Sequence, residues 1–139
     1  MPLSIRNQLP GTVTAITPGE VMATVKVDLS GGHHLTAAIT REAAQDLALT
    51  PGSEVRALVK STEVALATAP VTGLSIRNQL PGTVSEIATG EAMTSIKITV
   101  AGGELTSAIT TEAATDLGLT PGTPVIALIK STEISLATP

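Results

Sequence analysis

The chain has 139 residues, no cysteine, no aromatic residue and a formal net charge of −4. The negative charge and the thin spread of eight basic residues argue against a nucleic-acid-binding protein, because phosphate contacts need clustered Lys and Arg. Without cysteine there are no disulfides and no thiolate metal sites, and without aromatic residues the core has to consist of small aliphatic side chains, so we expect association to complete it.

The chain contains two copies of one sequence. Residues 3–13 return letter for letter as residues 74–84, and most later positions also recur. This predicts two small domains, 1–69 and 74–139, joined by a linker of residues 70–73 that is too short to let them separate. A functional site should then be present in both copies, which removes most enzyme hypotheses.

The first elements of each repeat are predicted to be strands. Apolar and polar residues alternate over residues 21–29, which is typical of a half-buried strand, and a second such segment covers residues 35–39. A glycine pair lies between the two segments, so we expect them to form a hairpin. Next, Thr40 is placed to cap a short helix over residues 41–47.

Two further strands complete each repeat. Residues 55–59 form the first, and residues 64–66 are expected to close the barrel of their own repeat, as are 125–129 and 134–136 in the second copy. About five short strands with one short helix after the third indicate an all-β fold of two tandem OB-like small barrels.

The sequence also predicts a location. Residues 1–7 lack the basic start and the apolar stretch of a signal peptide, and no uncharged segment is long enough to cross a bilayer. We therefore expect a cytoplasmic protein that has no membrane partner and no nucleic-acid partner.

The candidate catalytic and metal-binding groups do not support a site, because the histidines occur in one copy only and the carboxylate pairs are placed for solvent exposure. His33 and His34 occur in one copy only, where alignment pairs His33 with Glu104, so a solvated hairpin tip is the better interpretation than a metal or acid/base site. The carboxylate pairs of the two predicted helices are spaced for solvent exposure: Glu42 with Asp46, and Glu112 with Asp116. We predict no enzyme activity, no catalytic residue, no metal-ion ligand and no cofactor.

A set of hydrogen-bond donors does recur in both copies. Donors without carboxylates suit a tetrahedral oxyanion, because each can face one oxygen while Arg and Lys balance the charge. The alternative is that the cations only keep a small domain soluble. The set is Ser4, Arg6, Asn7, Thr40, Lys60 and Ser61, with Ser75, Arg77, Asn78, Thr110, Lys130 and Ser131 as counterparts.

These motifs resemble a known family. The start Leu-Ser-Ile-Arg-Asn-Gln-Leu-Pro-Gly-Thr-Val, the central Ile-Thr and the late Val-Lys-Ser-Thr-Glu are similar, in order and spacing, to the Mop domain of the molbindins, which bind molybdate. The resemblance covers nearly the whole chain twice. It implies Mop-type barrels, an assembly of six domains and hence a homotrimer of two-domain chains, with molybdate or tungstate bound at interfaces between domains.

The resemblance also implies roles for single residues. The oxyanion ligands would be Ser4, Arg6, Thr40, Lys60 and Ser61, and in the second copy Ser75, Arg77, Thr110, Lys130 and Ser131. Asn7 and Asn78 would instead hold the arginine-bearing segments in shape. Ala43 and Ala113 stand where many relatives have a ligand serine, so a backbone amide at the helix N-terminus would have to replace that hydroxyl.

The function expected from these observations is storage or buffering of molybdate or tungstate without a chemical step. The alternative is a regulatory module that senses the oxyanion and acts through a separate transporter or regulator protein. An OB-type nucleic-acid binder is a weaker alternative, because single-strand stacking needs aromatic rings.

Overall fold

The computed structural model describes residues 2–101 and 103–139 of the chain. The first half forms β1 (Asn7–Pro18), β2 (Met22–Leu29), β3 (His34–Thr40), α1 (Arg41–Asp46), β4 (Glu54–Val59), the 3₁₀ helix η1 (Ser61–Glu63) and β5 (Ala65–Ala67). The second half repeats the series as β6 (Asn78–Thr89), β7 (Met93–Val100), β8 (Gly103–Thr110), α2 (Thr111–Asp116), β9 (Pro124–Ile129), η2 (Ser131–Glu133) and β10 (Ser135–Ala137).

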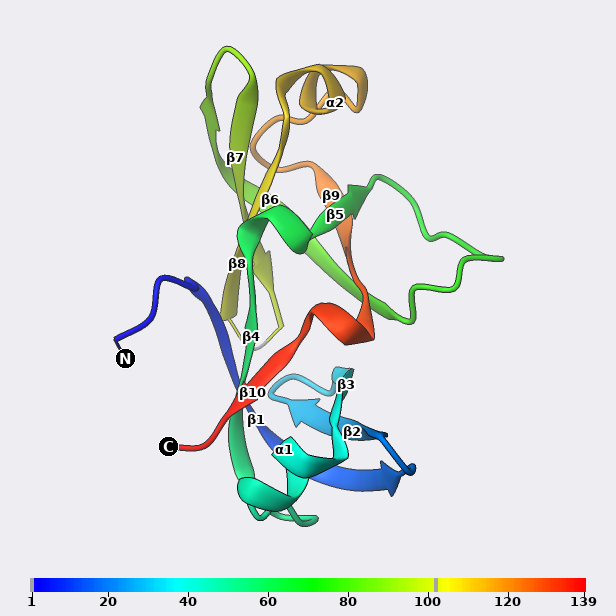
Figure 1. Cartoon of the computed structure of the whole chain (residues 1–139). Coiled ribbons are helices and arrows are strands. Elements are labelled where there is room, and N and C mark those ends of the chain that lie inside the picture. The colour runs from blue at the N-terminus through cyan, green and yellow to red at the C-terminus, as the bar shows by residue number, and fades with distance from the viewer. Residues whose placement is uncertain (1, 102) are drawn as a thin grey trace.

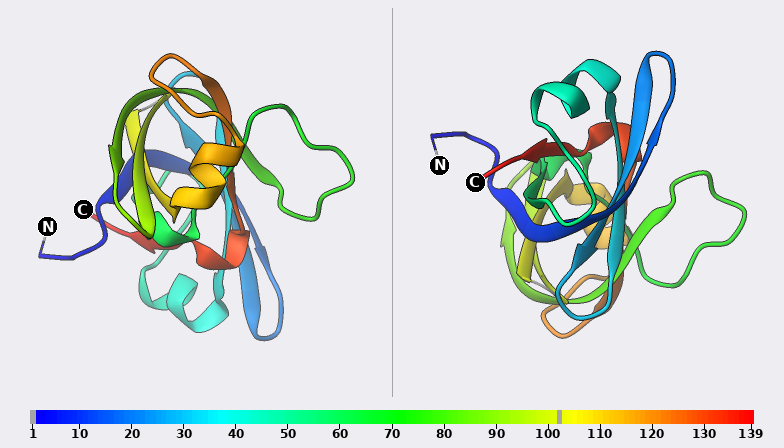
Figure 2. Two further views of the ribbon diagram at one scale, coloured as in Figure 1. Left: turned by 90° about the horizontal axis from the view of Figure 1, so that it is seen from above. Right: turned by 90° about the horizontal axis from the view of Figure 1, so that it is seen from below.

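The strands form two five-stranded antiparallel sheets that curl into half-barrels, one above the other (Figure 1). The predicted all-β fold with two OB-like units and one short α-helix in each is therefore confirmed. The β2–β3 hairpin is confirmed as well, with Val25 paired to Ala37 and Val27 to Leu35. The segment that joins the two halves loops away from the body of the molecule (Figure 2).

The last strand of each repeat belongs to the sheet of the other repeat. The strand orders are β10-β4-β1-β2-β3 and β5-β9-β6-β7-β8, so β10 joins the first sheet and β5 joins the second. The prediction that residues 64–66 close the barrel of their own repeat is wrong. The sequence could not distinguish the two pairings, because both repeats end in nearly the same residues and offer the same partner strand.

The exchanged strands also close the half-barrels. β10 contacts β3, the strand at the opposite edge of the first sheet, and β5 contacts β8 in the same way. Because each repeat supplies one strand of the other's sheet, neither sheet is complete without both repeats.

Pro10 and Gly11 lie where β1 begins to pair with β2 in addition to β4. Pro10 pairs with Arg56 on β4, while pairing with β2 begins only at Gly11, so the missing amide hydrogen of Pro10 costs no ladder bond on the β2 side. A Cβ atom on Gly11 would lie 2.7 Å from the backbone oxygen of Asp28. The second copy keeps the same pair as Pro81 and Gly82, for the same reason.

The core contains only aliphatic side chains, and it runs through both repeats. Its fully buried members form one contiguous cluster, with Val13, Val25 and Val27 in the first sheet and Ile96 and Ile98 in the second. In addition, β1 contacts β8 and β3 contacts β6. The expectation that the two thin barrels touch is confirmed.

One buried hydrogen bond gives a direct test of this packing. Ser107 is fully buried, and its Oγ donates to the backbone oxygen of Val64 in the other repeat at 2.6 Å. The first repeat has Ala37 at the corresponding position, which is also fully buried.

We expect Ser107→Ala to lower the free energy of unfolding by about 1–2 kcal/mol, because the Val64 carbonyl loses its partner while the cavity formed is small. Urea unfolding measures this difference. The control is Ser95→Ala, which changes a half-buried serine on the adjacent strand whose side chain forms no hydrogen bond within the described residues. Equal effects of the two variants would show that the bond to Val64 contributes nothing.

Within the described residues, no helix is long and apolar enough to cross a membrane.

Candidate functional site

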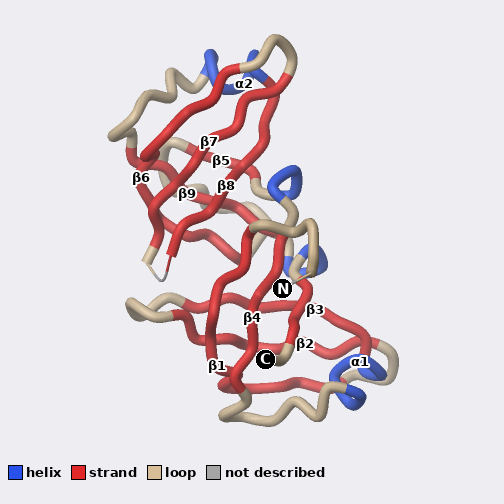
Figure 3. Tube along the Cα trace, turned by 90° about the vertical axis from the view of Figure 1, so that its left-hand side faces the viewer, coloured by secondary structure: helices blue, strands red, loops and turns tan. Residues whose placement is uncertain are grey.

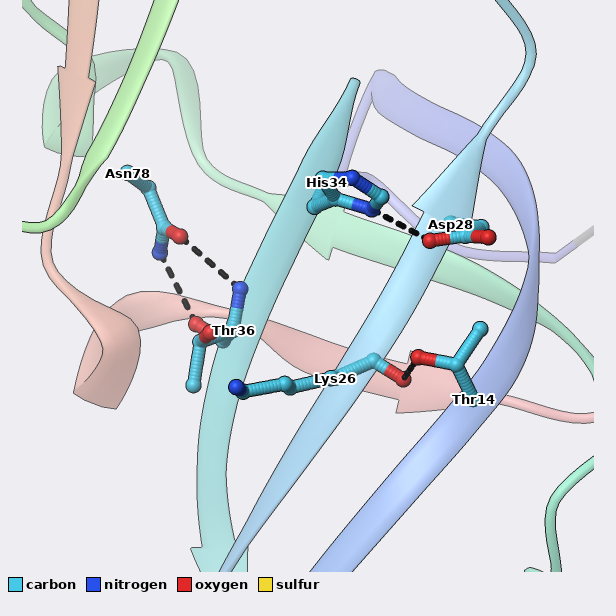
Figure 4. A network of polar contacts seen from close by, with 6 residues as sticks. All are labelled: Thr14, Lys26, Asp28, His34, Thr36 and Asn78. Atoms are coloured by element: carbon cyan, nitrogen blue, oxygen red, sulfur yellow. Dashed lines mark hydrogen bonds and ion pairs between the residues drawn. The ribbon is translucent and has the colours of Figure 1, made fainter. Parts of the chain in front are cut away.

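Two buried asparagines connect the repeats. Asn7, at the start of β1, is 2% exposed, and its Nδ2 donates to the backbone oxygen of Thr106 on β8 at 2.8 Å. The amide N–H of Thr106 donates back to Asn7 Oδ1, also at 2.8 Å. Asn78 forms the same pair of bonds with Thr36 on β3, both at 2.8 Å, as Figure 4 shows.

These asparagines replace a neighbouring strand. β3 and β8 are edge strands, and Thr36 and Thr106 would otherwise present an unpaired N–H and an unpaired carbonyl at the edge. Each asparagine satisfies both groups at once. The side chains of Asn7 and Asn78 are therefore engaged in joining the repeats.

The sheet register brings the two cations of each copy together. Asn7 pairs with Val59 at the end of the antiparallel β1–β4 ladder, so Arg6 and Lys60 are the next residues beyond that last pair. Asn78 pairs with Ile129 in the same way, so Arg77 and Lys130 are the next residues there. All four cations are exposed.

Like charges at opposing positions of an antiparallel pair repel each other. In the part of the chain that the structure describes, the ion pairs are His34 with Asp28 and Lys97 with Glu86, and neither involves these four cations. In each copy these two cations therefore form no ion pair with a carboxylate among the described residues. An anion that binds both would relieve the repulsion.

The serines of the predicted set lie beside the cation pairs. Ser61 and Ser131 follow the lysines directly, open the 3₁₀ helices η1 and η2, and are half-buried. Ser131 Oγ lies 3.5 Å from Asn78 Nδ2, a long hydrogen bond. Ser4 and Ser75 are exposed, two residues before the arginines, and so remain available to a ligand.

A hollow of about 240 Å³ also borders Lys130, at the boundary between the repeats. Glu63 and Glu133 line it together with apolar residues such as Ile109. With two carboxylates and one ammonium, this hollow is less favourable for a divalent anion than the side of Lys130 that faces Arg77, where two cations lie together. We therefore expect an anion held by Lys130 to lie on the side of Arg77.

Thr40 and Thr110 lie elsewhere. Each caps its helix, with the Oγ1 atom accepting the N–H of Ala43 or Ala113 at 3.1 Å. The helices lie at opposite ends of the molecule, whereas η1 and η2 lie near its middle (Figures 1 and 3). One chain therefore does not bring the threonines and the cation pairs into one site.

The caps also occupy the backbone amides of Ala43 and Ala113, so that these amides are not free to donate to a ligand. The N–H groups of Ala43 and Ala113 already donate to the capping threonines, so these amides do not replace the serine hydroxyl that the chain lacks. The expectation that a backbone amide at the helix N-terminus takes over stays a prediction for the other amides there. The threonine hydroxyls keep their own hydrogens for a ligand, since they act only as acceptors in the caps.

The histidines lie at the tip of the β2–β3 hairpin, as predicted. His34 is exposed and forms an ion pair with Asp28, the residue opposite on β2 (Figure 4). Among residues 2–101 and 103–139, no group of three or more potential metal ligands is found. The alignment of His33 with Glu104 is wrong, because His34 occupies the strand position that Glu104 has in the second copy. The first copy has one residue more than the second between the glycine pair and Leu35, and the sequence alone does not show which of the two histidines is the inserted one.

Thr36 and Thr106 were not expected to contribute. They act through backbone groups, so their side-chain chemistry gave no signal. Their identity in the two copies gave no signal either, because five of the six residues 35–40 recur at 105–110.

The chain was compared with known proteins. Residues 3–66 and 74–136 each match the model of the TOBE domain. Over its full length the chain is 40% identical to the molybdenum-pterin-binding protein MopA of Rhodobacter capsulatus, and over 99% of its length it is 38% identical to the molybdenum transport protein ModE of Azotobacter vinelandii. It covers 53% and 51% of these proteins, so it spans about half the length of the curated relatives it matches.

A solved structure matches along the whole length of both chains. It is that of the cytoplasmic molybdate-binding protein ModG with molybdate bound, and it agrees with this structure at a TM-score of 0.96 and 42% sequence identity.

Proposed function

Because the chain belongs to the TOBE-domain family, with one domain match in each sequence repeat, we propose that it binds molybdate or tungstate and stores or buffers the oxyanion without a chemical step. The observation that carries this proposal is the recurrence of two neighbouring exposed cations that form no ion pair among the described residues, Arg6 with Lys60 and Arg77 with Lys130. The molybdate bound to the similar protein ModG supports it. The proposed units are the repeats 1–69 and 74–139, with residues 70–73 as the linker.

The ligand is held by hydrogen bonds rather than by coordination to the metal atom. The proposed contacts are donors only: Arg, Lys, Ser and Thr side chains, which face the oxygens of an intact tetrahedral anion. No thiolate is available, since the chain has no cysteine. The protein therefore takes the oxyanion as a ligand and needs no cofactor.

A complete site needs more than one chain. The helices that Thr40 and Thr110 cap, α1 and α2, lie at opposite ends of the molecule, whereas η1 and η2, which the lysines precede, lie near its middle (Figures 1 and 3). A ligand that contacts both kinds of group therefore binds between chains. We propose a homotrimer, in which six domains place each threonine beside a cation pair of a neighbour. This arrangement agrees with the interface sites that the family resemblance implies. The cytoplasm is the proposed location, as it is for ModG.

The trimer is tested by light scattering of the purified protein. We expect a mass of three chains at micromolar concentration, because the proposed sites lie between chains and because association can cover the adjacent exposed side chains of Val21 and Met22. A stable monomer would contradict both the trimer and the location of the sites between chains.

Calorimetric titration tests the ligand. Molybdate and tungstate should bind well ahead of sulfate and phosphate, because a site of fixed donors distinguishes oxyanions by size and protonation. Equal affinity for sulfate would reduce the proposal to a general anion site.

A second candidate function is regulation, because the chain is also similar to the transport protein ModE. In that case the oxyanion-loaded protein acts on a separate transporter or regulator protein. The two functions differ in how firmly the ions are held. A storage protein retains several ions per assembly on gel filtration, whereas a sensor loses its ions when the free oxyanion concentration falls below the level to which it responds.

A further inference from the structure

The surroundings of the two capping threonines differ in charge. A hollow of about 730 Å³ beside Thr40 is lined by Glu20, Glu42 and Arg41, together with uncharged groups. In the second copy the residue at the position of Arg41 is Thr111, while both glutamates recur as Glu91 and Glu112. The first threonine thus has a cation beside two carboxylates, and the repeat gives the second the corresponding carboxylates without that cation.

Arg41 makes little use of its donors within the chain. Its Nη1 donates to the backbone oxygen of Gly19 at 3.3 Å, and the side chain is exposed. It takes part in no ion pair among the described residues. Because a guanidinium has five N–H donors, most of them remain available to a ligand.

In the second copy an uncharged hydroxyl makes the hydrogen bond that the Arg41 guanidinium makes in the first copy. Thr111 Oγ1 donates to the backbone oxygen of Gly90, the counterpart of Gly19, at 2.8 Å. It also lies 2.8 Å from the hydroxyl of Thr94, which is buried and stands where the first copy has Ala23. A hydroxyl is therefore sufficient to hold this hairpin, so the fold does not require the positive charge of Arg41.

We propose that Arg41 makes the oxyanion position at Thr40 tighter than the one at Thr110, so that each chain offers two unequal positions to a divalent tetrahedral oxyanion. This inference rests on the proposed function. One cation near a divalent anion at the protein surface, partly screened by salt, corresponds to about a 3- to 10-fold difference in affinity.

Molybdate titration of the whole protein by equilibrium dialysis tests the inference. The wild type should show two classes of site, about 3- to 10-fold apart at low salt and closer together at 0.5 M NaCl. Arg41→Thr should merge the two classes at the weaker affinity. The double variant Ala23→Thr with Arg41→Thr reproduces the residue pair of the second copy and should give the same result with the hairpin bond restored.

Two control variants separate a local effect from a general one. Arg56→Ile also introduces the residue of the second copy and removes one positive charge, but it lies on β4, away from Thr40. Gln45→Thr changes the same hollow without changing its charge. Both should leave the two classes of site as in the wild type.

The reverse pair of substitutions, made in the second copy, should increase affinity. Thr94→Ala with Thr111→Arg gives the second copy the pair found in the first, and it should tighten the weaker class by about the factor that Arg41→Thr removes. A single class of site in the wild type, or equal effects of Arg41→Thr and Arg56→Ile, would overturn the inference. Either result leaves the proposed function standing as long as binding still depends on Arg6 and Arg77.

Discussion

Replacing Arg6 and Arg77 by alanine together should abolish most oxyanion binding while the protein stays folded and assembled. Each guanidinium is expected to supply charge-assisted hydrogen bonds worth about 1.5–3 kcal/mol, so each single change should weaken binding about 10- to 150-fold. Both side chains are exposed and have no ion-pair partner among the described residues, so their loss should leave the core unchanged. Calorimetry with molybdate measures the loss, and light scattering verifies the assembly.

Two comparisons make this prediction specific. Lys60→Ala and Lys130→Ala should act in the same direction but more weakly, because an ammonium makes fewer fixed contacts than a guanidinium. The paired change His33→Ala with His34→Ala should have no effect on binding, since the histidines lie at an exposed hairpin tip. Loss of binding in the histidine variant, with binding intact in the arginine variants, would point to a metal site in the first copy instead.

The second large effect is expected at the asparagines that connect the repeats. Asn7→Ala should leave the N–H and the carbonyl of Thr106 without partners at a half-buried edge, at about 1–3 kcal/mol for each group. Asn78→Ala should do the same at Thr36. The two changes together remove a large fraction of the 5–15 kcal/mol that is typical of a folded domain, and thermal unfolding should show it as a large fall in Tm.

Matched variants identify the cause of this loss. Asn7→Asp keeps the size of the side chain and an acceptor for the Thr106 N–H, but it places a carboxylate oxygen against the Thr106 carbonyl and should therefore also destabilise. Gln8→Ala removes the neighbouring amide, whose 3.0 Å bond to the Ile5 carbonyl stays within one segment, and should cost no more than about 1 kcal/mol. If Asn7→Ala were as mild as Gln8→Ala, the asparagines would not be what joins the repeats.

Features set by neighbouring residues were predictable from the sequence. The alternation over residues 21–29 predicted β2 because side chains of a strand point to opposite faces. Thr40 was identified as the helix cap because a hydroxyl before a helix satisfies an otherwise free N–H, and α1 does begin at Arg41. The predicted helix end at residue 47 is one position beyond Asp46, which is within the uncertainty of helix ends.

Contacts for which either repeat could supply the partner were not predictable from the sequence. β5 pairs with β9 instead of the equivalent strand of its own repeat, and the two pairings offer nearly identical contacts. The neighbourhood of Arg6 and Lys60 depends on the register of β1 with β4, which becomes known only once Asn7 is found opposite Val59. Duplication revealed which residues recur, and the three-dimensional structure revealed which repeat each of them faces.

A crystal structure of the protein grown with molybdate would locate the bound anion, because anomalous scattering finds molybdenum without assumptions about the site. We expect strong peaks beside both cation pairs, within hydrogen-bonding reach of Arg6 and Lys60 and of Arg77 and Lys130, each with a threonine of a neighbouring chain on its other side. Peaks at the hairpin tip near Asp28 and His34, or no peak beside either cation pair at saturating molybdate, would contradict this expectation.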